Sequence, residues 1–243
     1  MTTTSSSTAD TDPTGKLAGR TVIVTGGASG LGAAVAMVVG EAGGQPVVFD
    51  RRSPLAEVEY EEVDLADTHA AEAAVRRTAE RCGGLDAVVT CAGVDLPAPL
   101  TDLSSDQWEW IVRVNLFGTV AVTRAALPWL EQRSGRVVTV ASTLGHRVAG
   151  DASAYCASKW GVVGFTRALT EEMKGRVGVT LLTPGGMSTA FFDDRTDQYK
   201  PGPDAQLCDP CDVAEAALFA LTRPAGCEVK EIVVAGPNEV SWP

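Results

Sequence analysis

The chain has 243 residues, of which 45% are hydrophobic and 21% charged, so it contains enough apolar material for the core of a single α/β domain. Its formal net charge of −11 argues against nucleic acids and anionic membranes as partners, because both repel an acidic surface. No apolar run approaches the roughly 20 residues that span a bilayer, so we expect no membrane partner.

The N-terminal stretch and the cysteines indicate how the chain is organised and where it resides. Residues 1–16 are rich in threonine and serine and lack an apolar segment, so we expect a disordered tail there and one domain over 17–243. The scattered cysteines favour free thiols in a reducing, cytoplasmic compartment. Cys208 and Cys211 form a lone CxxC without a second pair of ligands, so we predict no metal site.

The first predicted elements are a strand, a glycine-rich turn and a helix. Residues 20–25 form a continuous β-branched apolar run, which is typical of a strand buried on both faces. The turn that follows reads Gly26-Gly-Ala-Ser-Gly30-Leu-Gly32 and leads into an alanine- and valine-rich helix ending near Gly43. Glycines let the backbone approach a phosphate, and a helix N-terminus offers unpaired N–H groups. The pattern therefore favours a phosphate-binding turn over an ordinary tight turn.

The second predicted strand, over residues 46–50, ends in Asp50, eighteen positions after Gly32 (50 − 32). A dinucleotide fold places a carboxylate at about this distance to bind the adenosine ribose hydroxyls. Arg51 and Arg52 could instead bind a 2′-phosphate, but Asp50 would repel that group. We therefore favour NAD as the cofactor and keep NADP as the alternative.

Strands and helices alternate along most of the remaining chain. The predicted strands cover residues 58–63, 85–90, 136–142, 177–182 and 231–235, and the predicted helices cover 67–81, 104–130, a segment containing Tyr155 that reaches about 173, and 210–222. This order predicts an α/β protein with a Rossmann-type doubly wound seven-stranded parallel sheet, helices on both faces and a single domain.

A candidate acid/base group lies between Ser142 and Lys159. A spacing of four puts Tyr155 and Lys159 on one helix face, where a lysine within ~4–6 Å would lower the phenol pKa from its usual value of about 10. Ser142 comes at the carboxyl end of a predicted strand, the edge at which open α/β sheets bind ligands. The spacing alone also suits a lysine that merely lies over an aromatic ring. Together with Ser142 at the strand end, the Tyr155–Lys159 spacing favours acid/base catalysis on a carbonyl or alcohol substrate.

Taken in order over about residues 17–236, these motifs resemble the short-chain dehydrogenase/reductase family in its single-domain branch. The resemblance implies a nicotinamide-dependent oxidoreductase that interconverts a secondary alcohol and a ketone, with Tyr155 as the acid/base. It implies that Asn115 holds a water linking Lys159 to solvent. The catalytic set that it implies is Asn115, Ser142, Tyr155 and Lys159.

The same resemblance implies the cofactor contacts. Asp64 would bond the adenine edge, and the segment from Pro184 to Thr189 would hold the nicotinamide carboxamide. The complete expected set is Gly26, Ser29, Gly30, Leu31, Gly32, Asp50, Arg51, Asp64, Leu65, Cys91, Ala92, Gly93, Tyr155, Lys159, Pro184, Gly185, Met187 and Thr189.

Three departures from the family pattern change these expectations. Cys91 stands where the family commonly has asparagine, so we expect it to cost some stability or to move a cofactor contact. The chain between Asp50 and Asp64 is too short for a full helix, which would leave the adenosine end of the cofactor more exposed. Ala235-Gly236-Pro237 replaces a common Asp-Gly-Gly, so the packing of the C-terminal tail is less predictable.

The residues expected around the substrate are mostly apolar, which suits a hydrophobic ketone or secondary alcohol. They are Asp95, Leu96, Leu144, His146, Gly186, Met187, Phe191 and Phe192. His146 could equally face solvent, and the two phenylalanines could form a lid or simply pack beneath the site. Four tryptophans lie on helices for which the resemblance implies subunit contacts, so we expect a homo-oligomer, a tetramer or a dimer: Trp108, Trp110, Trp129 and Trp160.

Two alternative functions are weighed against this one. The first is an NADP-dependent ketoreductase of a biosynthetic pathway, with Arg51 or Arg52 as the phosphate ligand. The second is a non-catalytic dinucleotide sensor, which is disfavoured because all four members of the implied catalytic set are present.

Overall fold

The computed structural model describes residues 15–242, and seven parallel strands form its single sheet. Their order across the sheet is β3-β2-β1-β4-β5-β6-β7. The direction of winding reverses between β1 and β4, and their carboxyl ends therefore flank the position where such sheets bind ligands. The predicted doubly wound sheet is confirmed. The strands are β1 (Thr21–Thr25), β2 (Gln45–Asp50), β3 (Glu59–Glu62), β4 (Ala87–Thr90), β5 (Arg136–Val140), β6 (Gly178–Pro184) and β7 (Glu231–Val234).

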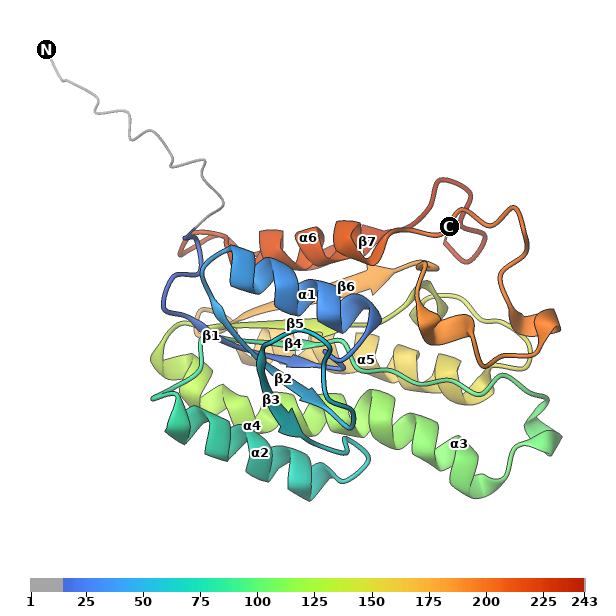
Figure 1. Ribbon diagram of the computed structural model, residues 1–243, viewed down its shortest axis with the longest axis horizontal. Coiled ribbons are helices and arrows are strands. Elements are labelled where there is room, and N and C mark those ends of the chain that lie inside the picture. The colour runs from blue at the N-terminus through green and yellow to red at the C-terminus, as the bar shows by residue number, and fades with distance from the viewer. Residues whose placement is uncertain (1–14, 243) are drawn as a thin grey trace, which may run out of the picture.

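Helices cover both faces of the sheet (Figure 1). Helices α1 (Gly30–Glu41) and α6 (Pro210–Leu221) pack on one face. Helices α2 (Thr68–Arg81), α4 (Thr119–Gln132) and α5 (Ser153–Glu172) pack on the other. Successive side chains of a strand point to opposite faces, so Val22 and Val24 enter the first core cluster and Ile23 the second. Burial on both faces explains why the central strands are continuous apolar runs.

The starts of several helices are fixed by side chains that accept hydrogen bonds from the first amide groups. The Asp67 carboxylate accepts from the amides of His69 and Ala70 at the start of α2. Ser104 and Gln107 form a capping box at the start of α3 (Ser105–Val112).

The predicted helix over 104–130 consists of three segments. Helix α3 leads into a π-helical segment, η2 (Arg113–Gly118), and then into α4. Gly118 lies against Leu65, where a Cβ would come within 2.8 Å of the Leu65 backbone oxygen. Single-turn π segments often lie at functional sites, and this one turns Asn115 into the protein.

By length and composition, the combined stretch Ser105–Gln132 could cross a membrane, but half of its most apolar window is buried within this fold. Its α4 side chains Val122, Ala126 and Leu130 belong to the core cluster beneath α2. Core packing therefore accounts for its apolar character.

The connection between β2 and β3 contains no helix, as the short spacing predicts. Residues 51–58 form a loop, and β3 lies at the edge of the sheet. Helix α2 holds this strand through Arg81, which bonds Glu59 and Glu61, and through Arg77, whose Nη2 lies 3.1 Å from Glu61 Oε2.

Most of the predicted N-terminal tail lies outside the described residues. Its last two positions, Gly15 and Lys16, are described, and the Gly15 amide donates to the Ala42 backbone oxygen at 3.2 Å. The ordered part of the chain therefore begins no later than Gly15.

Candidate active site

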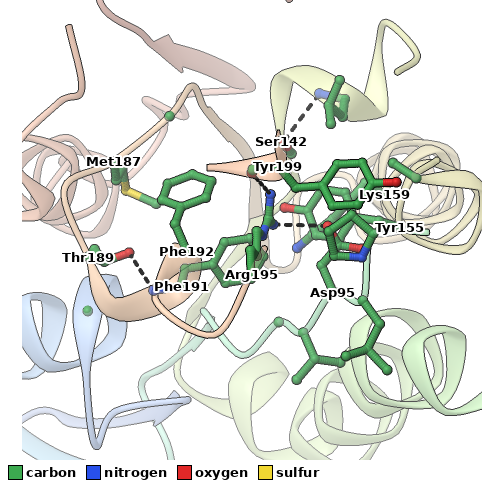
Figure 2. Close-up of a pocket in the computed structure, with 18 of the residues that line it drawn as sticks. Asp95, Ser142, Tyr155, Lys159, Met187, Thr189, Phe191, Phe192, Arg195 and Tyr199 are labelled. Atoms are coloured by element: carbon green, nitrogen blue, oxygen red, sulfur yellow. Dashed lines mark hydrogen bonds and ion pairs between the residues drawn. The ribbon is translucent and has the colours of Figure 1, made fainter. Parts of the chain in front are cut away.

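A cavity of about 1660 Å³ opens at the carboxyl ends of the strands. All eighteen residues of the predicted cofactor set line it, from Gly26 to Thr189. Ser142 also lines it, as do all the predicted substrate residues except His146. Side chains from distant parts of the sequence thus face a single space (Figure 2).

The glycine turn between β1 and α1 allows the close backbone contacts that shape one end of the cavity. At Gly26, with φ of 70°, a Cβ would lie 2.7 Å from Ala92 Cα. At Gly32, a Cβ would lie 2.2 Å from the Gly26 backbone oxygen. Only glycine satisfies both positions.

The first turn of α1 is suited to an anionic group. The Ser29 side chain makes no capping bond to the backbone, so N–H groups at the helix start remain available. Together with the glycines, they form a cradle that fits the pyrophosphate of a dinucleotide.

Asp50 and Arg52 lie beside this turn. Asp50 Oδ2 accepts a hydrogen bond from the Ala28 amide at 3.1 Å, and Arg52 Nη2 lies 3.2 Å from Ser29 Oγ. A carboxylate and a guanidinium therefore flank the part of the cavity that would hold the adenosine ribose. The short β2–β3 loop leaves both arginines, Arg51 and Arg52, exposed.

Lys159 is buried beneath the cavity, with only 3% of its surface exposed. Its Nζ donates to the Val140 backbone oxygen at 3.0 Å and lies 5.7 Å from the centre of the Tyr155 ring. Burial lowers the pKa of Lys159 to about 8. The helical spacing of four thus brings amine and phenol together as predicted.

The Tyr155 hydroxyl is surrounded by groups with opposite effects on its pKa. Burial raises the pKa of Tyr155 to about 12, against which a hydrogen bond with Ser142 acts to lower it. The charge of Asp95 raises this pKa further, whereas that of Arg195 lowers it. The phenol therefore carries its proton near neutral pH, and the predicted lowering of its pKa below the usual value of about 10 is wrong for this structure.

Asn115 is fully buried, and both its side-chain oxygen and its side-chain nitrogen are hydrogen-bonded to other residues. Its Oδ1 accepts from the Val94 amide at 2.8 Å, and its Nδ2 donates to the Val94 oxygen at 2.9 Å and to Ser158 Oγ at 3.0 Å. Asn115 thus joins η2, the loop after β4 and helix α5, but it does not line the cavity.

Cys91 lies at the carboxyl end of β4, where it packs against the core cluster beneath α1 and α6. Burial raises the pKa of its thiol to about 12, so the side chain is neutral. The adjacent Ala92 amide donates to Thr25 Oγ1 at 3.1 Å, which ties β4 to β1. A small apolar side chain is therefore accommodated here.

The substrate side of the cavity is formed by the segment after β6. Figure 2 shows Phe191 and Phe192, from η4 (Ala190–Phe192), beside Arg195, which reaches toward Asp95. The Phe191 ring lies 5.9 Å from the Tyr155 ring and 5.5 Å from that of Phe192. The two phenylalanines thus face the cavity, and Phe191 also contacts the phenol.

His146, unlike the other residues predicted around the substrate, does not line the cavity. Its Nε2 lies 3.2 Å from Thr183 Oγ1, and its ring packs edge-on against Trp242 at 5.2 Å. Burial lowers the pKa of His146. The C-terminal tail returns to cover this histidine, a contact between residues almost one hundred positions apart that no local pattern indicates.

The cavity residues that the sequence does not predict include Arg195 and Glu239. Arg195 pairs with Asp95 across one hundred positions, with Nη2 and Oδ2 2.9 Å apart. Glu239 binds the Gly186 amide through Oε2 at 2.9 Å. Both lie in irregular segments, where spacing carries no periodic signal.

Fold and site together define a dinucleotide-binding α/β protein with a phenol, a serine hydroxyl and a buried amine at one cavity. Comparison with known proteins sharpens this class: the model of the short chain dehydrogenase family matches residues 20–200. The chain belongs to the short-chain dehydrogenase family, and it is a nicotinamide-dependent oxidoreductase.

The relatives agree in length as well as in fold. An uncharacterised oxidoreductase of Staphylococcus aureus is 34% identical over 230 residues, covering 90% of this chain and 97% of its own. The aldohexose dehydrogenase of Thermoplasma acidophilum superposes with a TM-score of 0.83 at 22% identity, covering 91% of this chain and 94% of that one. A metagenomic short-chain oxidoreductase in complex with NADP superposes with a TM-score of 0.77 at 25% identity, and the match covers 90% of this chain and 98% of that one.

Proposed function

We propose that the protein interconverts a secondary alcohol and a ketone, with Tyr155 as the acid/base. The observation that carries the proposal is the meeting of Ser142, Tyr155 and Lys159 in the cavity that also contains the glycine cradle. When bound, a nicotinamide ring gives a hydride to the carbonyl carbon or takes one from the alcohol. Ser142 hydrogen-bonds the substrate oxygen, and in ketone reduction Tyr155 donates its proton to that oxygen.

The electrostatics of the site support this division of roles. A phenol with a pKa of about 12 is protonated near neutrality and can act as the acid. Lys159, whose pKa lies near 8, can carry a positive charge that stabilises the phenolate left after proton transfer. Asn115 fixes the backbone of Val94 at the cavity wall.

The proposal is tested with Tyr155→Phe, which removes only the phenolic oxygen. We expect kcat to fall below about 1% of the wild-type value, since positioned acid/base groups contribute about 10²–10⁴-fold. Cofactor affinity, measured by titration of the reduced nicotinamide fluorescence, should change little. A variant that retains more activity would rule out Tyr155 as the proton donor.

We propose NAD as the preferred cofactor. The Asp50 carboxylate supports this choice, because it lines the ribose end of the cavity and would repel a 2′-phosphate. The alternative of an NADP-dependent ketoreductase has its own support in Arg51, which lines the cavity, and in Arg52 beside Ser29. We expect kcat/KM to be higher with NADH than with NADPH, and a preference for NADPH above tenfold would overturn the argument from Asp50.

We further propose a cytoplasmic homo-oligomer, a dimer or a tetramer. Six free cysteines support a reducing compartment. Large apolar side chains that remain exposed on η2 and α5 support self-association.

A further inference from the structure

A buried ion pair forms one wall of the cavity next to Tyr155. Arg195 Nη2 lies 2.9 Å from Asp95 Oδ2, and the exposed fractions of the two side chains are 14% and 5%. The loop after β4 carries Asp95, and the segment after η4 carries Arg195 (Figure 2). The Phe191 ring lies 4.8 Å from the Arg195 guanidinium and 5.9 Å from the Tyr155 ring, so the pair lies on the same side of the cavity as the phenol of the proposed reaction.

One acceptor and one donor of this pair have no hydrogen-bond partner among the described residues. They are Asp95 Oδ1 and Arg195 Nε, and both atoms are buried. Fully buried polar atoms are nearly always bonded, so each unpaired one calls for a missing partner. The exposed pair of Arg167 and Glu231 behaves differently, because Nε and Nη2 there bond both carboxylate oxygens, at 2.7 and 3.1 Å.

The rest of the Arg195 guanidinium is already engaged. Its Nη1 lies 3.5 Å from the Tyr199 backbone oxygen, and its centre lies 4.8 Å from the Phe191 ring and 4.7 Å from the Phe192 ring. These contacts hold the arginine in the segment that also carries both phenylalanines. Movement of this segment would uncover the unpaired atoms and admit a ligand, and its return would bury the ligand against aromatic rings.

The chemistry of the unpaired atoms restricts what can satisfy them. A hydroxyl group both donates and accepts hydrogen bonds, so it can serve a carboxylate oxygen and a guanidinium N–H at once. A carboxylate can accept from Arg195 but has no donor for Asp95, and an ammonium can donate to Asp95 but has no acceptor for Arg195. A methyl group would leave both atoms unpaired.

We propose that Asp95 and Arg195 bind a second hydroxyl group of the substrate, on the carbon next to the carbonyl. The substrate class is then the α-hydroxy ketones and the corresponding vicinal diols. This inference rests on the proposed function and narrows the expectation of a purely hydrophobic ketone. The aromatic rings of Phe191 and Phe192 would cover the apolar remainder of such a substrate.

The test compares three aryl ketones of similar size with reduced cofactor: 2-hydroxyacetophenone, propiophenone and benzoylformate. They place a hydroxyl, a methyl or a carboxylate near the pair. We expect kcat/KM for the hydroxy ketone to exceed both others by about tenfold or more, since a site built to bond a hydroxyl discriminates against analogues that lack it. Equal values, or a preference for benzoylformate, would overturn the proposal.

The double variant Asp95→Ala/Arg195→Met removes both charges and so avoids leaving either buried alone. We expect the ratio of kcat/KM for 2-hydroxyacetophenone to that for propiophenone to fall to about one. The matched control Arg167→Met/Glu231→Ala removes an ion pair outside the cavity and should keep the wild-type ratio. A wild-type ratio retained in the Asp95/Arg195 variant would also overturn the proposal.

Binding decides the question independently of turnover. Calorimetric titration of 1-phenyl-1,2-ethanediol and 1-phenyl-1-propanol into the protein with reduced cofactor, a combination that cannot react, should show tighter binding of the diol in the wild type and in the control. Equal binding would contradict this inference. Absence of turnover with every ketone tested would instead contradict the proposed function, and the two failures are therefore distinguishable.

Discussion

Lys159 is a buried amine whose Nζ donates a hydrogen bond to the Val140 backbone oxygen. Its pKa of about 8 means that the folded protein holds the lysine proton less tightly than the unfolded chain, in which the pKa is about 10.4. Protonation therefore favours unfolding. The free energy of unfolding is therefore highest above the unfolded-state pKa of about 10.4. It decreases as the pH falls from there through the folded-state pKa of about 8.

This linkage predicts how Lys159→Met changes stability with pH. The wild type should gain roughly 2 kcal/mol of unfolding free energy relative to the variant between pH 7 and pH 9.5. Urea unfolding without cofactor, followed by tryptophan fluorescence, measures the difference. Lys174→Met alters a lysine whose side chain is 77% exposed and should show no such pH dependence. If the unfolding free energies of the wild type and Lys159→Met differ by the same amount at pH 7 and pH 9.5, Lys159 is not desolvated in solution.

At the scale of elements, the C-terminal tail acts on the loop after β6. Glu239 Oε2 accepts from the Gly186 amide, and Oε1 accepts from the Ser241 amide at 3.1 Å and from its hydroxyl at 2.6 Å. Burial would raise the pKa of Glu239, but these hydrogen bonds lower it overall. Because Gly185 and Gly186 line the cavity, the tail helps to fix the backbone that would hold the nicotinamide end of the cofactor.

We therefore expect Glu239→Ala to weaken cofactor binding while leaving the rate of the chemical step nearly unchanged. Loss of the hydrogen bonds frees the loop, so KM for the cofactor should rise three- to tenfold, whereas kcat should stay within about twofold. Initial-rate kinetics at saturating substrate measure both constants. Glu215→Ala, on the exposed face of α6, is the control and should leave both unchanged. A fall in kcat without a change in KM would contradict this role.

The same elements show what the sequence could and could not predict. The glycine turn and the Tyr155–Lys159 pair depend on local spacing, so their geometry follows from strand and helix periodicity. The contacts of Arg195, His146 and Glu239 each involve at least one residue outside the regular strands and α-helices, and their partners lie 100, 37 and 53 positions away. Such contacts depend on how loops pack after the sheet has formed, and no periodic pattern records that. Asn115 is an intermediate case, since its helix was predicted but its π-helical turn was not.

At the scale of the whole molecule, two large apolar side chains remain exposed on neighbouring elements. Phe117 of η2 is 47% exposed, and Trp160 of α5 is 49% exposed. Leu116, which precedes Phe117, packs on Gly161, which follows Trp160, and a Cβ at Gly161 would lie 2.6 Å from Leu116 Cδ2. Trp160 Nε1 donates to the Arg147 oxygen at 3.2 Å, which fixes the exposed ring in place. Both rings are next in sequence to this packed contact, and we infer that they belong to one apolar patch that a second copy of the chain covers.

The patch predicts the outcome of a substitution that leaves the core intact. The wild type should sediment as a dimer or a tetramer, and Phe117→Glu/Trp160→Glu should shift it to a smaller species with an unchanged circular dichroism spectrum. Two buried carboxylates would face their symmetry mates across the interface, where like charges are strongly unfavourable. Phe219→Glu changes an equally exposed ring on α6, on the opposite face of the sheet, and should preserve the assembly. A monomeric wild type, or dissociation caused only by Phe219→Glu, would exclude the η2–α5 patch as the interface.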